Sequence, residues 1–409
     1  MTWTIERLGH HGDGVARGSD GPVFVLGALP GEVVTGTLQG DRLVDMRIAT
    51  PSPHRRKPPC AHARSCGGCA LQHADDGFVA AWKLDVVRAA LAGQGLEAPV
   101  TGPETSPPQT RRRATLAGRR TRAGVALGFH MRGSDALVAV PGCQLLAPGL
   151  MAVFPALEAL VLAGATRKGE LSLTVTETLS GPDVAATGGK PLDAHLLQDL
   201  AALAETHRIA RLTWDAEVVA LRAQPLVAMG RARVPLPPGA FLQATPQGEA
   251  ALLAAVRAGI GPARRLVDLF AGCGTFALPL AETADVHAVE GDAALTAAMS
   301  AAARATPGLR PLTTETRDLF RRPLLPDELR CDAVVIDPPR AGAEAQVAEL
   351  ARARVPVVVM VSCNPVTFAR DARALVAAGY IPEPVQVVDQ FRWSTHVEMV
   401  ARFTVAKTA

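Results

Sequence analysis

The stretch that decides the fold of the C-terminal third is Arg265-Leu266-Val267-Asp268-Leu269-Phe270-Ala271-Gly272-Cys273-Gly274-Thr275-Phe276-Ala277. Its first half predicts a short, largely apolar strand that carries one acid, Asp268. Gly272 and Gly274 predict a tight turn free of side chains, and a helix is expected to open near Thr275. Such a strand-turn-helix unit brings backbone N–H groups and a helix N-terminus up to a ligand. The stretch therefore indicates a site for a nucleotide-type cofactor.

The segments around this stretch alternate between strands and helices, which is typical of a doubly wound α/β sheet. One strand ends in Glu290, a carboxylate suited to ribose hydroxyls. Two further apolar strands end in Asp337-Pro338-Pro339-Arg340 and in Ser362-Cys363-Asn364-Pro365, and a final strand is expected to hold His396-Val397-Glu398. Because such sheets bind ligands at the carboxyl ends of their strands, these polar residues are candidates for one site.

The glycine turn also satisfies the dinucleotide pattern, with Glu290 at a suitable distance, so an NAD enzyme is the first rival. An NAD site does not explain Asp268 on the first strand, nor the polar strand ends at Asp337 and Cys363. Together these residues favour an S-adenosylmethionine site.

Each candidate residue also has a structural interpretation. Asp337-Pro338-Pro339 could only stop a strand, since proline cannot continue the ladder. Cys363 could be a small buried residue, but its place between Ser362 and Asn364 at a strand end favours a nucleophile. Glu398 could be a surface carboxylate on an edge strand. Cys273 and Cys331 lack partner chemistry in the sequence and are interpreted as core residues.

Residues 1–50 are rich in glycine with short apolar segments, which predicts a small β-barrel. The prolines between positions 51 and 59 indicate a linker. From about residue 81 to 239 the pattern is mixed and predicts an α+β central domain. Basic residues, nearly all of them arginine, cluster at Arg55-Arg56-Lys57, Arg111-Arg112-Arg113 and Arg119-Arg120-Thr121-Arg122. Arginine suits phosphate and base contacts, although a solvated surface is an equal explanation.

Three cysteines, Cys60, Cys66 and Cys69, lie within ten residues, and Cys143 follows later. Four thiolates suit an iron–sulfur cluster or a structural zinc ion. Zinc usually prefers two close pairs, whereas this spacing is three plus one, so a cluster is favoured over zinc and over unliganded core cysteines.

The chain has 409 residues, enough for two to four domains, and 48% of them are hydrophobic. No stretch approaches the roughly 18 apolar residues of a membrane span, and Met1 to Arg7 does not resemble a signal peptide. We therefore expect a cytoplasmic protein, and a monomer. The net charge of +3 does not itself announce a nucleic-acid partner.

In these motifs the chain resembles the RNA 5-methyluridine (uracil-C5) methyltransferases, above all the cluster-containing 23S ribosomal RNA enzymes. Phe241-Leu242-Gln243, the Asp268 stretch, Asp337-Pro338-Pro339-Arg340, Ser362-Cys363-Asn364-Pro365 and His396-Val397-Glu398 match the catalytic domain of that family in order. The N-terminal barrel looks like a TRAM domain. The resemblance spans nearly the whole chain.

The resemblance implies a site and a mechanism. It implies Cys363 as nucleophile and Glu398 as base, and Cys60, Cys66, Cys69 and Cys143 as ligands of a [4Fe-4S] cluster. It implies S-adenosylmethionine contacts from Gln243, Phe270, Thr275, Glu290, Asp318 and Asp337. Thr275 stands where some family members carry asparagine. Cys363 would add to C6 of a uridine, C5 would take the methyl group, and Glu398 would remove the C5 proton.

These features predict three domains: a TRAM-like, OB-like barrel over residues 1–52, an α+β central domain with the cluster site over 53–240, and a methyltransferase domain over 241–409. The predicted substrate is RNA, with 23S rRNA favoured, and the barrel and arginine clusters would grip it. A tRNA uracil-C5 methyltransferase, an amino-group methyltransferase and a non-catalytic RNA-binding protein are the alternatives. The sequence does not say which uridine is modified.

Overall fold

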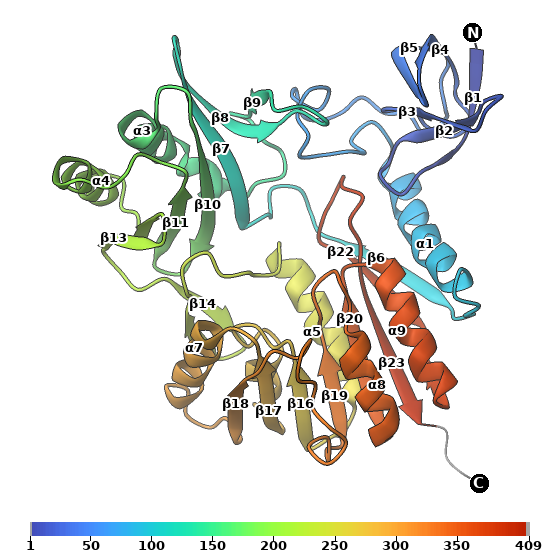
Figure 1. Ribbon diagram of the computed structural model, residues 1–409, viewed down its shortest axis with the longest axis vertical. Coiled ribbons are helices and arrows are strands. Elements are labelled where there is room, and N and C mark those ends of the chain that lie inside the picture. Colours follow the sequence, from blue (N-terminus) through green and yellow to red (C-terminus); the bar gives the residue numbers. More distant parts are fainter. Residues whose placement is uncertain (1, 406–409) are drawn as a thin grey trace.

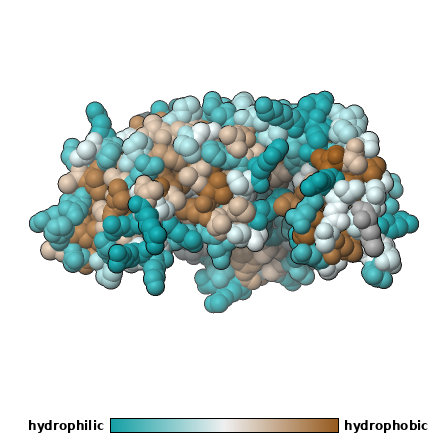
Figure 2. Space-filling model, turned by 90° about the horizontal axis from the view of Figure 1, so that it is seen from above, coloured by the Kyte–Doolittle hydropathy of each residue, from teal (hydrophilic) through white to brown (hydrophobic). Residues whose placement is uncertain are grey.

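The computed structural model describes residues 2–405, which form a barrel, a central sheet with its helices, and a C-terminal sheet with helices on both faces (Figure 1). None of the described helices is long and apolar enough to cross a membrane. Seen from above, hydrophilic and hydrophobic patches alternate over both the barrel and the central part (Figure 2).

The N-terminal strands close into a barrel in the order β1-β2-β3-β5-β4. Closure follows because β1 pairs with both β2 and β4. Alternate side chains point inward, as in Trp3 and Ile5 of β1, which are buried among valines of the other strands. The predicted OB-like barrel is confirmed. Its strands are β1 Thr2–Leu8, β2 Gly14–Arg17, β3 Pro22–Val25, β4 Val33–Gln39 and β5 Arg42–Thr50.

The central part is a sheet in the order β13-β12-β11-β10-β7-β8-β9, covered by two helices that pack on each other, α3 and α4. Its core includes Leu157 and Leu160 of α3, and Trp214 of β12. The strands are β7 Arg113–Thr121, β8 Gly124–His130, β9 Leu137–Ala139, β10 Glu170–Thr178, β11 Gly181–Thr187, β12 Arg211–Trp214 and β13 Glu217–Leu221. The helices are α2 Pro148–Ala152, α3 Phe154–Gly164 and α4 Ala194–Thr206, and a hairpin of β14 Leu226–Met229 and β15 Ala232–Pro235 follows.

The C-terminal sheet has the order β18-β17-β16-β19-β20-β23-β22-β6, with β21 paired to β23. The five strands from β18 to β20 are parallel, whereas β23 runs antiparallel to its neighbours β20 and β22. The predicted doubly wound sheet is confirmed. Its strands are β6 Val100–Thr105, β16 Arg265–Leu269, β17 Asp285–Glu290, β18 Leu312–Thr316, β19 Ala333–Ile336, β20 Val357–Ser362, β21 Tyr380–Pro382, β22 Val385–Asp389 and β23 Glu398–Val405.

Helices cover both faces of this sheet. One buried cluster joins the sheet to α5 and α7, and a second joins its other face to α1, α8 and α9. The helices are α1 Asp76–Ala92, α5 Pro246–Ile260, α6 Ala277–Leu280, α7 Ala293–Arg304, α8 Glu344–Ala353 and α9 Pro365–Ala377. The strand order reverses between β16 and β19, which is where such sheets bind ligands.

Two elements from the range predicted as the central domain belong to the C-terminal sheet. Strand β6 pairs in parallel with β22, and α1 packs against β6 and α9 (Figure 1). Both segments precede the catalytic range by more than a hundred residues, so their own sequence patterns carry no sign of that partner.

Two local boundaries differ from the sequence expectation. Helix α6 begins at Ala277, two residues beyond Thr275, and has only four residues. The last strand begins at Glu398, so His396 and Val397 belong to the segment before it. A long helix dipole therefore does not follow the glycine turn, whose Gly272 and Gly274 N–H groups donate to Glu290 and to the Ala271 carbonyl.

Candidate active site

The carboxyl ends of β16, β17, β19 and β20 meet at one edge of the sheet. Register fixes their levels, because Leu269 pairs with both Val289 and Ile336, and Ile336 pairs with Met360. The chain then leaves β19 at Asp337 and β20 at Cys363. The parallel sheet therefore brings together the strand-end residues that the sequence singled out.

Cys363 directly follows strand β20, and Glu398 begins the neighbouring strand β23. Ser362 pairs with Met399 in the antiparallel ladder of β20 and β23, so Cys363 and Glu398 directly adjoin the last pair of this ladder. Cys363 thus comes from the end of β20 and Glu398 from the start of β23, although the two residues are more than thirty positions apart in the chain.

Burial dominates the electrostatics of this pair. It raises the pKa of the Cys363 thiol to about 11, with the neighbouring Glu398 and Asp337 carboxyls adding to the shift and Arg340 opposing it. Burial also raises the pKa of Glu398 to about 8, with Asp337 adding to the shift and the Gln390 side chain and Arg340 opposing it. Glu398 is only 4% exposed. At neutral pH the thiol and a large fraction of the carboxyl hold their protons.

The Asp337-Pro338-Pro339-Arg340 turn is tied to the cysteine segment. The Arg340 carbonyl accepts hydrogen bonds from Asn364 Nδ2 at 2.9 Å and from Thr367 Oγ1 at 3.2 Å. Asn364 also caps α9, since its side chain accepts from the Val366 N–H. Burial raises the pKa of Asp337 to about 7. The turn and the cap hold Cys363 between two fixed segments.

The Arg340 guanidinium extends to the ring of His396, two residues before Glu398. Burial, followed by Arg340, lowers the pKa of His396 to about 4, so the imidazole is neutral. Its ring packs against Phe391 with centroids 5.5 Å apart. Arg340 is therefore bound to a neutral partner and keeps its charge available beside Cys363.

The glycine turn has the conformation that its sequence requires. Gly272 and Gly274 have φ values of 57° and 99°, and a Cβ on Gly274 would lie 2.8 Å from Leu278. Phe270 also has a positive φ, 60°, which is strained for a residue with a side chain and is typical of functional sites. Glu290 accepts from the Gly272 N–H at 3.0 Å and from the Asp292 N–H at 2.9 Å, which fixes the turn.

Asp268 is fully buried beneath this turn. The Ala277 N–H approaches its carboxyl, but neither oxygen makes a hydrogen bond of ordinary geometry with the described residues. Burial, followed by the carboxyls of Asp337 and Glu290, raises its pKa well above the usual range. A buried carboxyl without such a hydrogen bond is costly and rare in a native protein. The arrangement fits a ligand that brings a positive charge or hydrogen-bond donors to this edge.

The remaining predicted cofactor residues, Gln243, Thr275 and Asp318, differ in how deeply they are buried. Gln243 is buried, and its Oε1 accepts from Gln390 Nε2 at 2.5 Å. Thr275 lies half-buried in the turn before α6. Asp318 is exposed and caps the turn after β18 by accepting from the Phe320 N–H at 3.0 Å. Phe320 and the predicted Phe270 face each other with ring centroids 5.4 Å apart.

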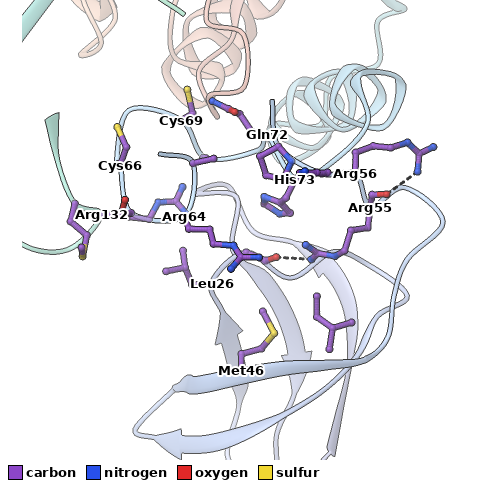
Figure 3. A pocket seen from close by; sticks show the side chains of 18 residues that line it. Leu26, Met46, Arg55, Arg56, Arg64, Cys66, Cys69, Gln72, His73 and Arg132 are labelled. Atoms are coloured by element: carbon purple, nitrogen blue, oxygen red, sulfur yellow. Dashed lines mark hydrogen bonds between the residues drawn. The ribbon is translucent and has the colours of Figure 1, made fainter. Parts of the chain in front are cut away.

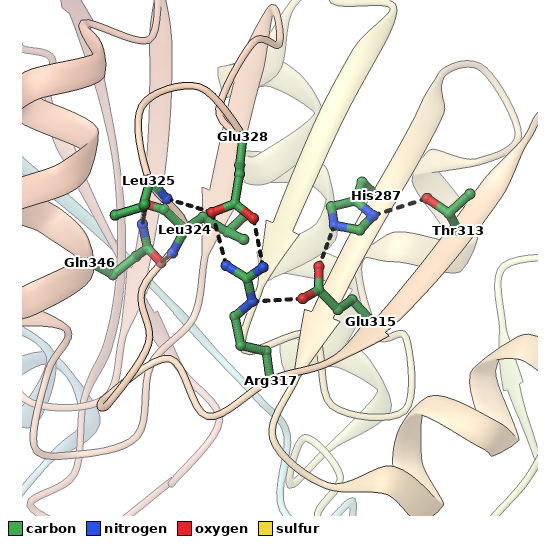
Figure 4. A network of polar contacts seen from close by, with 8 residues as sticks. All are labelled: His287, Thr313, Glu315, Arg317, Leu324, Leu325, Glu328 and Gln346. Atoms are coloured by element: carbon green, nitrogen blue, oxygen red, sulfur yellow. Dashed lines mark hydrogen bonds and ion pairs between the residues drawn. The ribbon is translucent and has the colours of Figure 1, made fainter.

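A polar network holds the segment that carries Asp318 (Figure 4). Arg317 binds Glu328 through two nitrogens, at 3.0 and 2.6 Å, and Glu315 through its Nε at 2.6 Å. A planar guanidinium with two carboxylate partners is rigid. The network therefore fixes the residue immediately before Asp318.

Sequence reasoning missed Asp389 and Gln390. Strand β22 runs parallel to β20, because both are antiparallel to β23, so its carboxyl end reaches the same edge as Cys363. Gln390 bridges two parts of the edge: its Nε2 donates to Gln243, and its Oε1 accepts from the Ala244 N–H at 2.7 Å. The signal that identified Asp337, a polar residue after an apolar strand, was also present at Asp389.

The four cysteines predicted to bind a cluster lie in one region, but in the described part of the chain they are not arranged to hold a metal ion. Burial, together with the other thiols of the set, raises the pKa of Cys66 and raises the pKa of Cys69 to about 12. Among residues 2–405, no group of three or more His, Cys, Asp and Glu side chains is arranged to hold a metal ion. The geometry therefore does not support the predicted [4Fe-4S] cluster.

The doubly wound sheet, its glycine turn and the acidic strand ends define the class of S-adenosylmethionine-dependent methyltransferases. Residues 311–403 match the family described as tRNA (Uracil-5-)-methyltransferase. An uncharacterized RNA methyltransferase of Brucella suis biovar 1 (strain 1330) is 45% identical over 402 residues, which cover 98% of this chain and 97% of that protein. The 23S rRNA (uracil(1939)-C(5))-methyltransferase RlmD of Halomonas elongata is 34% identical over 421 residues, covering 96% of this chain and 87% of that protein.

Among solved structures, the tRNA (uracil-54, C5)-methyltransferase of Pyrococcus abyssi in complex with S-adenosyl-L-homocysteine has a TM-score of 0.77, with 21% identity and 99% of both chains covered. It shares the fold. The chain belongs to the RNA (uracil-C5) methyltransferase family, and it is an S-adenosylmethionine-dependent enzyme of that family.

Proposed function

We propose that this enzyme transfers a methyl group from S-adenosylmethionine to C5 of a uridine in RNA, with 23S rRNA as the favoured substrate and Cys363 as a covalent nucleophile. The observation that carries the proposal is the nearness of Cys363 and Glu398, which directly adjoin the last pair of the β20–β23 ladder, Ser362 with Met399, so that the Glu398 carboxyl adds to the raised pKa of the thiol. An enzyme that methylates amino groups needs neither a thiol nor a second acid at this place. The choice of 23S rRNA follows the name of the Halomonas elongata relative.

The reaction follows from the chemistry of the two side chains. The Cys363 thiolate forms a bond to C6 of the uracil, and the electrons of the C5–C6 double bond move to the C4 oxygen as an enolate. The enolate makes C5 nucleophilic, so C5 takes the methyl group and the methyl–sulfur bond of the donor breaks. Glu398 then removes the C5 proton, the C5–C6 double bond re-forms, and the thiolate leaves.

Cys363 and Glu398 can each act only after losing a proton. The Cys363 thiol must lose its proton before it adds, and the Arg340 guanidinium lowers the cost of the thiolate. Glu398 must be ionised to take the C5 proton, and its pKa of about 8 means that more of it is ionised as pH rises. Turnover should therefore rise with pH through about 8.

The methyl donor would be held by Gln243, Phe270, Thr275, Glu290, Asp318 and Asp337. Support comes from the fully buried Asp268 carboxyl beneath the glycine turn, which is approached by the Ala277 N–H but makes no hydrogen bond of ordinary geometry, and which suits a cationic ligand. The strained Phe270 and its pairing with Phe320 offer ring surface beside the same turn. Removal of the carboxylate in Glu290→Ala should weaken binding of the donor and loosen the turn that Glu290 fixes.

A trapped adduct tests the mechanism. RNA that contains 5-fluorouridine at the target cannot lose a C5 proton, so the parent enzyme should remain bonded to it after methylation. On a denaturing gel with labelled donor, the parent and Glu398→Gln should form the adduct, and Cys363→Ala should not. Methylation by Cys363→Ala at the parent rate would eliminate the covalent mechanism and return the amino-group alternative.

The substrate is tested separately. Purified enzyme and labelled donor are mixed in one reaction with 23S rRNA and in another with bulk tRNA, both RNAs taken from a strain that lacks the gene. We expect 5-methyluridine to form in the 23S rRNA. Mapping by mass spectrometry identifies the uridine. Labelling of tRNA alone would assign the enzyme to the tRNA branch of the family while leaving the chemistry intact.

The iron–sulfur cluster stays a prediction that rests on donor chemistry. Cys60, Cys66, Cys69 and Cys143 supply four thiols, the donor type that such clusters use. Protein purified without oxygen should be brown and contain about four irons per chain if the four thiolates hold a cubane. If the purified protein contains one zinc ion or no metal, the four cysteines do not hold an iron–sulfur cluster.

A further inference from the structure

Gln390 lies one residue beyond strand β22, and the chemistry proposed above gives it no task. Its side chain is only 2% exposed. Val388 pairs with Glu398 across β22 and β23, and Gln390 follows Val388 by two positions. Because side chains two positions apart point to the same face of an extended strand, Gln390 reaches the face that carries Glu398. Its amide therefore lies beside the proposed base.

The polar atoms of the Gln390 amide have partners that fix its orientation. Its Oε1 accepts from the Ala244 N–H at 2.7 Å, and its Nε2 donates to Gln243 Oε1 at 2.5 Å. An amide nitrogen has a second hydrogen, and with it Nε2 approaches the Glu398 carboxyl as a hydrogen-bond donor. The reverse orientation would place the NH2 group against the Ala244 N–H, so the amide is held in one orientation.

Helix α5 packs closely against this side chain. A Cβ on Gly248, in the first turn of α5, would lie 2.4 Å from Gln390 Cβ, so the approach depends on glycine. The Gly248 N–H donates to Oγ1 of the N-cap Thr245, and Thr245 in turn bonds to Ser106 Oγ at 2.7 Å. Gln390 is therefore packed between a fixed helix start and the base.

The next part of the chain is held separately by residues 60–71, the cysteine loop. The N–H groups of Ala70 and Leu71 donate to the Trp393 carbonyl, at 2.8 and 2.9 Å. Figure 3 shows part of this loop with the side chain of Cys69, which precedes Ala70 in the chain. Loss of the amide would therefore leave the middle of the segment in place, and its effect would fall on the base.

The charged and titratable groups that face Glu398 from β19 and β20 are Asp337, Arg340 and Cys363. Burial, followed by Asp337, raises the pKa of Glu398 to about 8, whereas Gln390 and Arg340 oppose that rise. The Glu398 carboxyl in turn adds to the rise that burial causes in the pKa of Cys363. The base is thus surrounded by groups that act on its charge.

The charged groups around β22 have their own partners. Lys83 Nζ donates to Asp389 at 2.5 Å, and Glu104 of β6 accepts from Gln386 Nε2 at 2.9 Å. Burial lowers the pKa of His396 to about 4, so its ring is neutral. The amide is therefore an uncharged hydrogen-bond donor to the base within a set of charged neighbours.

We propose that Gln390 is a positioning residue for the base: its amide holds the Glu398 carboxyl in place for removal of the C5 proton and ties it to Gln243. The proposal rests on the proposed function, because the base has a task only if a C5 proton must leave. Bond formation by Cys363 and transfer of the methyl group precede that step and do not need the amide. Gln390 therefore acts when the base takes the proton, the C5–C6 double bond re-forms and the thiolate leaves.

The test substitutes methionine, an unbranched side chain of similar length without a hydrogen-bond donor. Gln390→Met is compared with Gln386→Met, the same change on the same strand at a partly exposed residue. Enzyme in excess is mixed with saturating labelled S-adenosylmethionine and an unmodified 23S rRNA transcript in a single turnover. Quenched samples on a denaturing gel give two rates: the appearance of the methylated covalent complex, and its conversion into free RNA that contains 5-methyluridine.

We expect Gln390→Met to transfer the methyl group within about twofold of the parental rate and to resolve the complex about tenfold more slowly, since a misplaced base loses part of its effect. The complex should therefore accumulate on ordinary uridine. The resolution rate should rise with pH as Glu398 ionises, and its midpoint should move upward by about half a unit to one unit, because the carboxylate has lost a hydrogen bond that favours it. Gln386→Met should match the parent in both rates and in the midpoint.

A second variant keeps the test decisive if methionine disturbs the fold. Gln390→Glu has the same length and keeps an acceptor for the Ala244 N–H. It places a second carboxyl beside Glu398, and like charges at one site disfavour ionisation. The midpoint should therefore move upward further than in Gln390→Met, again with little change in methyl transfer.

Equal slowing of methyl transfer and resolution would overturn the proposal, because the amide would then support the whole edge rather than the base. Slow resolution with a parental pH midpoint would overturn it as well, as would resolution at the parental rate. If the parent forms no 5-methyluridine, the proposed function fails and this proposal fails with it. If the parent turns over and both Gln390 variants behave as the parent does, this proposal fails alone.

Discussion

Three carboxyl side chains, Asp268, Asp337 and Glu398, crowd one edge of the C-terminal sheet. Burial raises the pKa of each, well above the usual range for Asp268, to about 7 for Asp337 and to about 8 for Glu398. Asp337 adds to the shifts of the other two, because like charges at one site disfavour ionisation. Groups with such shifts gather where a protein binds charged ligands or moves protons.

The first prediction concerns the stability that Glu398 contributes. Its folded pKa of about 8 lies above its ordinary value of 4.5, so the folded protein holds this proton more tightly. The contribution is present in full below pH 4.5 and is lost as pH rises through about 8. The free energy of unfolding of the parent should fall over this range by on the order of 4–5 kcal/mol from this group, because each pKa unit corresponds to about 1.4 kcal/mol. Glu398→Gln, which cannot ionise, should show a smaller fall.

Urea unfolding at pH 5, 6.5 and 8 measures the effect. Glu158→Gln is the matched control, because Glu158 is exposed on α3 and should leave the pH dependence of the parent unchanged. If the two variants respond to pH alike, Glu398 ionises as an ordinary surface carboxyl and its assignment as a tuned base loses its basis.

At the scale of residues, the sequence identified the strand ends because apolar strands followed by polar residues have a local signature. The parallel sheet then placed Asp337 and Cys363 at one edge, as expected. The nearness of Cys363 and Glu398 has no such signature, since the register of an antiparallel neighbour depends on packing of the whole sheet. The strain at Phe270 and the lack of ordinary hydrogen bonds at Asp268 are likewise properties of the folded chain.

At the scale of elements, one buried ion pair joins α1 to the segment that leads to Glu398. Lys83 is 0% exposed, and its Nζ donates to Asp389 at 2.5 Å and to the Phe391 carbonyl at 3.1 Å. Burial lowers the pKa of Lys83, while Asp389 opposes the shift. The pair lies 306 residues apart in the chain, so the sequence could not reveal it.

The second prediction is that this pair positions the segment between β22 and β23. Lys83→Met leaves the Asp389 carboxyl buried without its cation and should lower the free energy of unfolding by about 3–5 kcal/mol. Turnover should fall as well, because Phe391 loses its contact and Glu398 follows in the same segment. Binding of S-adenosylmethionine should change less than turnover.

A double-mutant cycle checks this prediction. Lys83→Met with Asp389→Asn removes both charges, so it should be less destabilised than the sum of the two single variants. Additive losses would show that the two side chains act independently. Stable variants with parental turnover would show that other contacts hold the segment.

Elements with their own sequence pattern were predicted well, and elements defined by a distant partner were not. Helix α1 begins after the cap Asp75, and α4 begins after the cap Asp193, and an acidic residue before an amphipathic run is a local signal of a helix start. The pairing of β6 with β22 was not foreseen, because a six-residue strand carries no mark of the sheet it joins. The three-domain division therefore stays a prediction, with β6 and α1 crossing its second boundary.

At the scale of the molecule, a small apolar cluster joins the barrel to the rest of the enzyme. Leu8 and Leu29 come from the barrel, Leu71 from the cysteine loop, and Val79 and Trp82 from α1. Because α1 packs against α9, the helix that begins just after Cys363, the cluster connects the barrel to the catalytic edge of the C-terminal sheet. The position of the barrel is thus set by packing rather than by the linker.

The last prediction tests that connection. Trp82→Ala removes a side chain that is 8% exposed at the centre of the joining cluster, and should cost about 3–5 kcal/mol. The loss should fall on the attachment of the barrel, so calorimetry should resolve a separate, earlier transition. Protease should then cut the linker at positions 51–59 at temperatures where the parent resists.

Trp214→Ala is the matched control, because Trp214 is 1% exposed in the core of the central sheet and its loss should cost a similar amount. It should lower the unfolding temperature without exposing the linker first. Equal protection of the linker in both variants would mean that contacts outside the cluster, such as the approach of Gly12 to Thr395, hold the barrel in place.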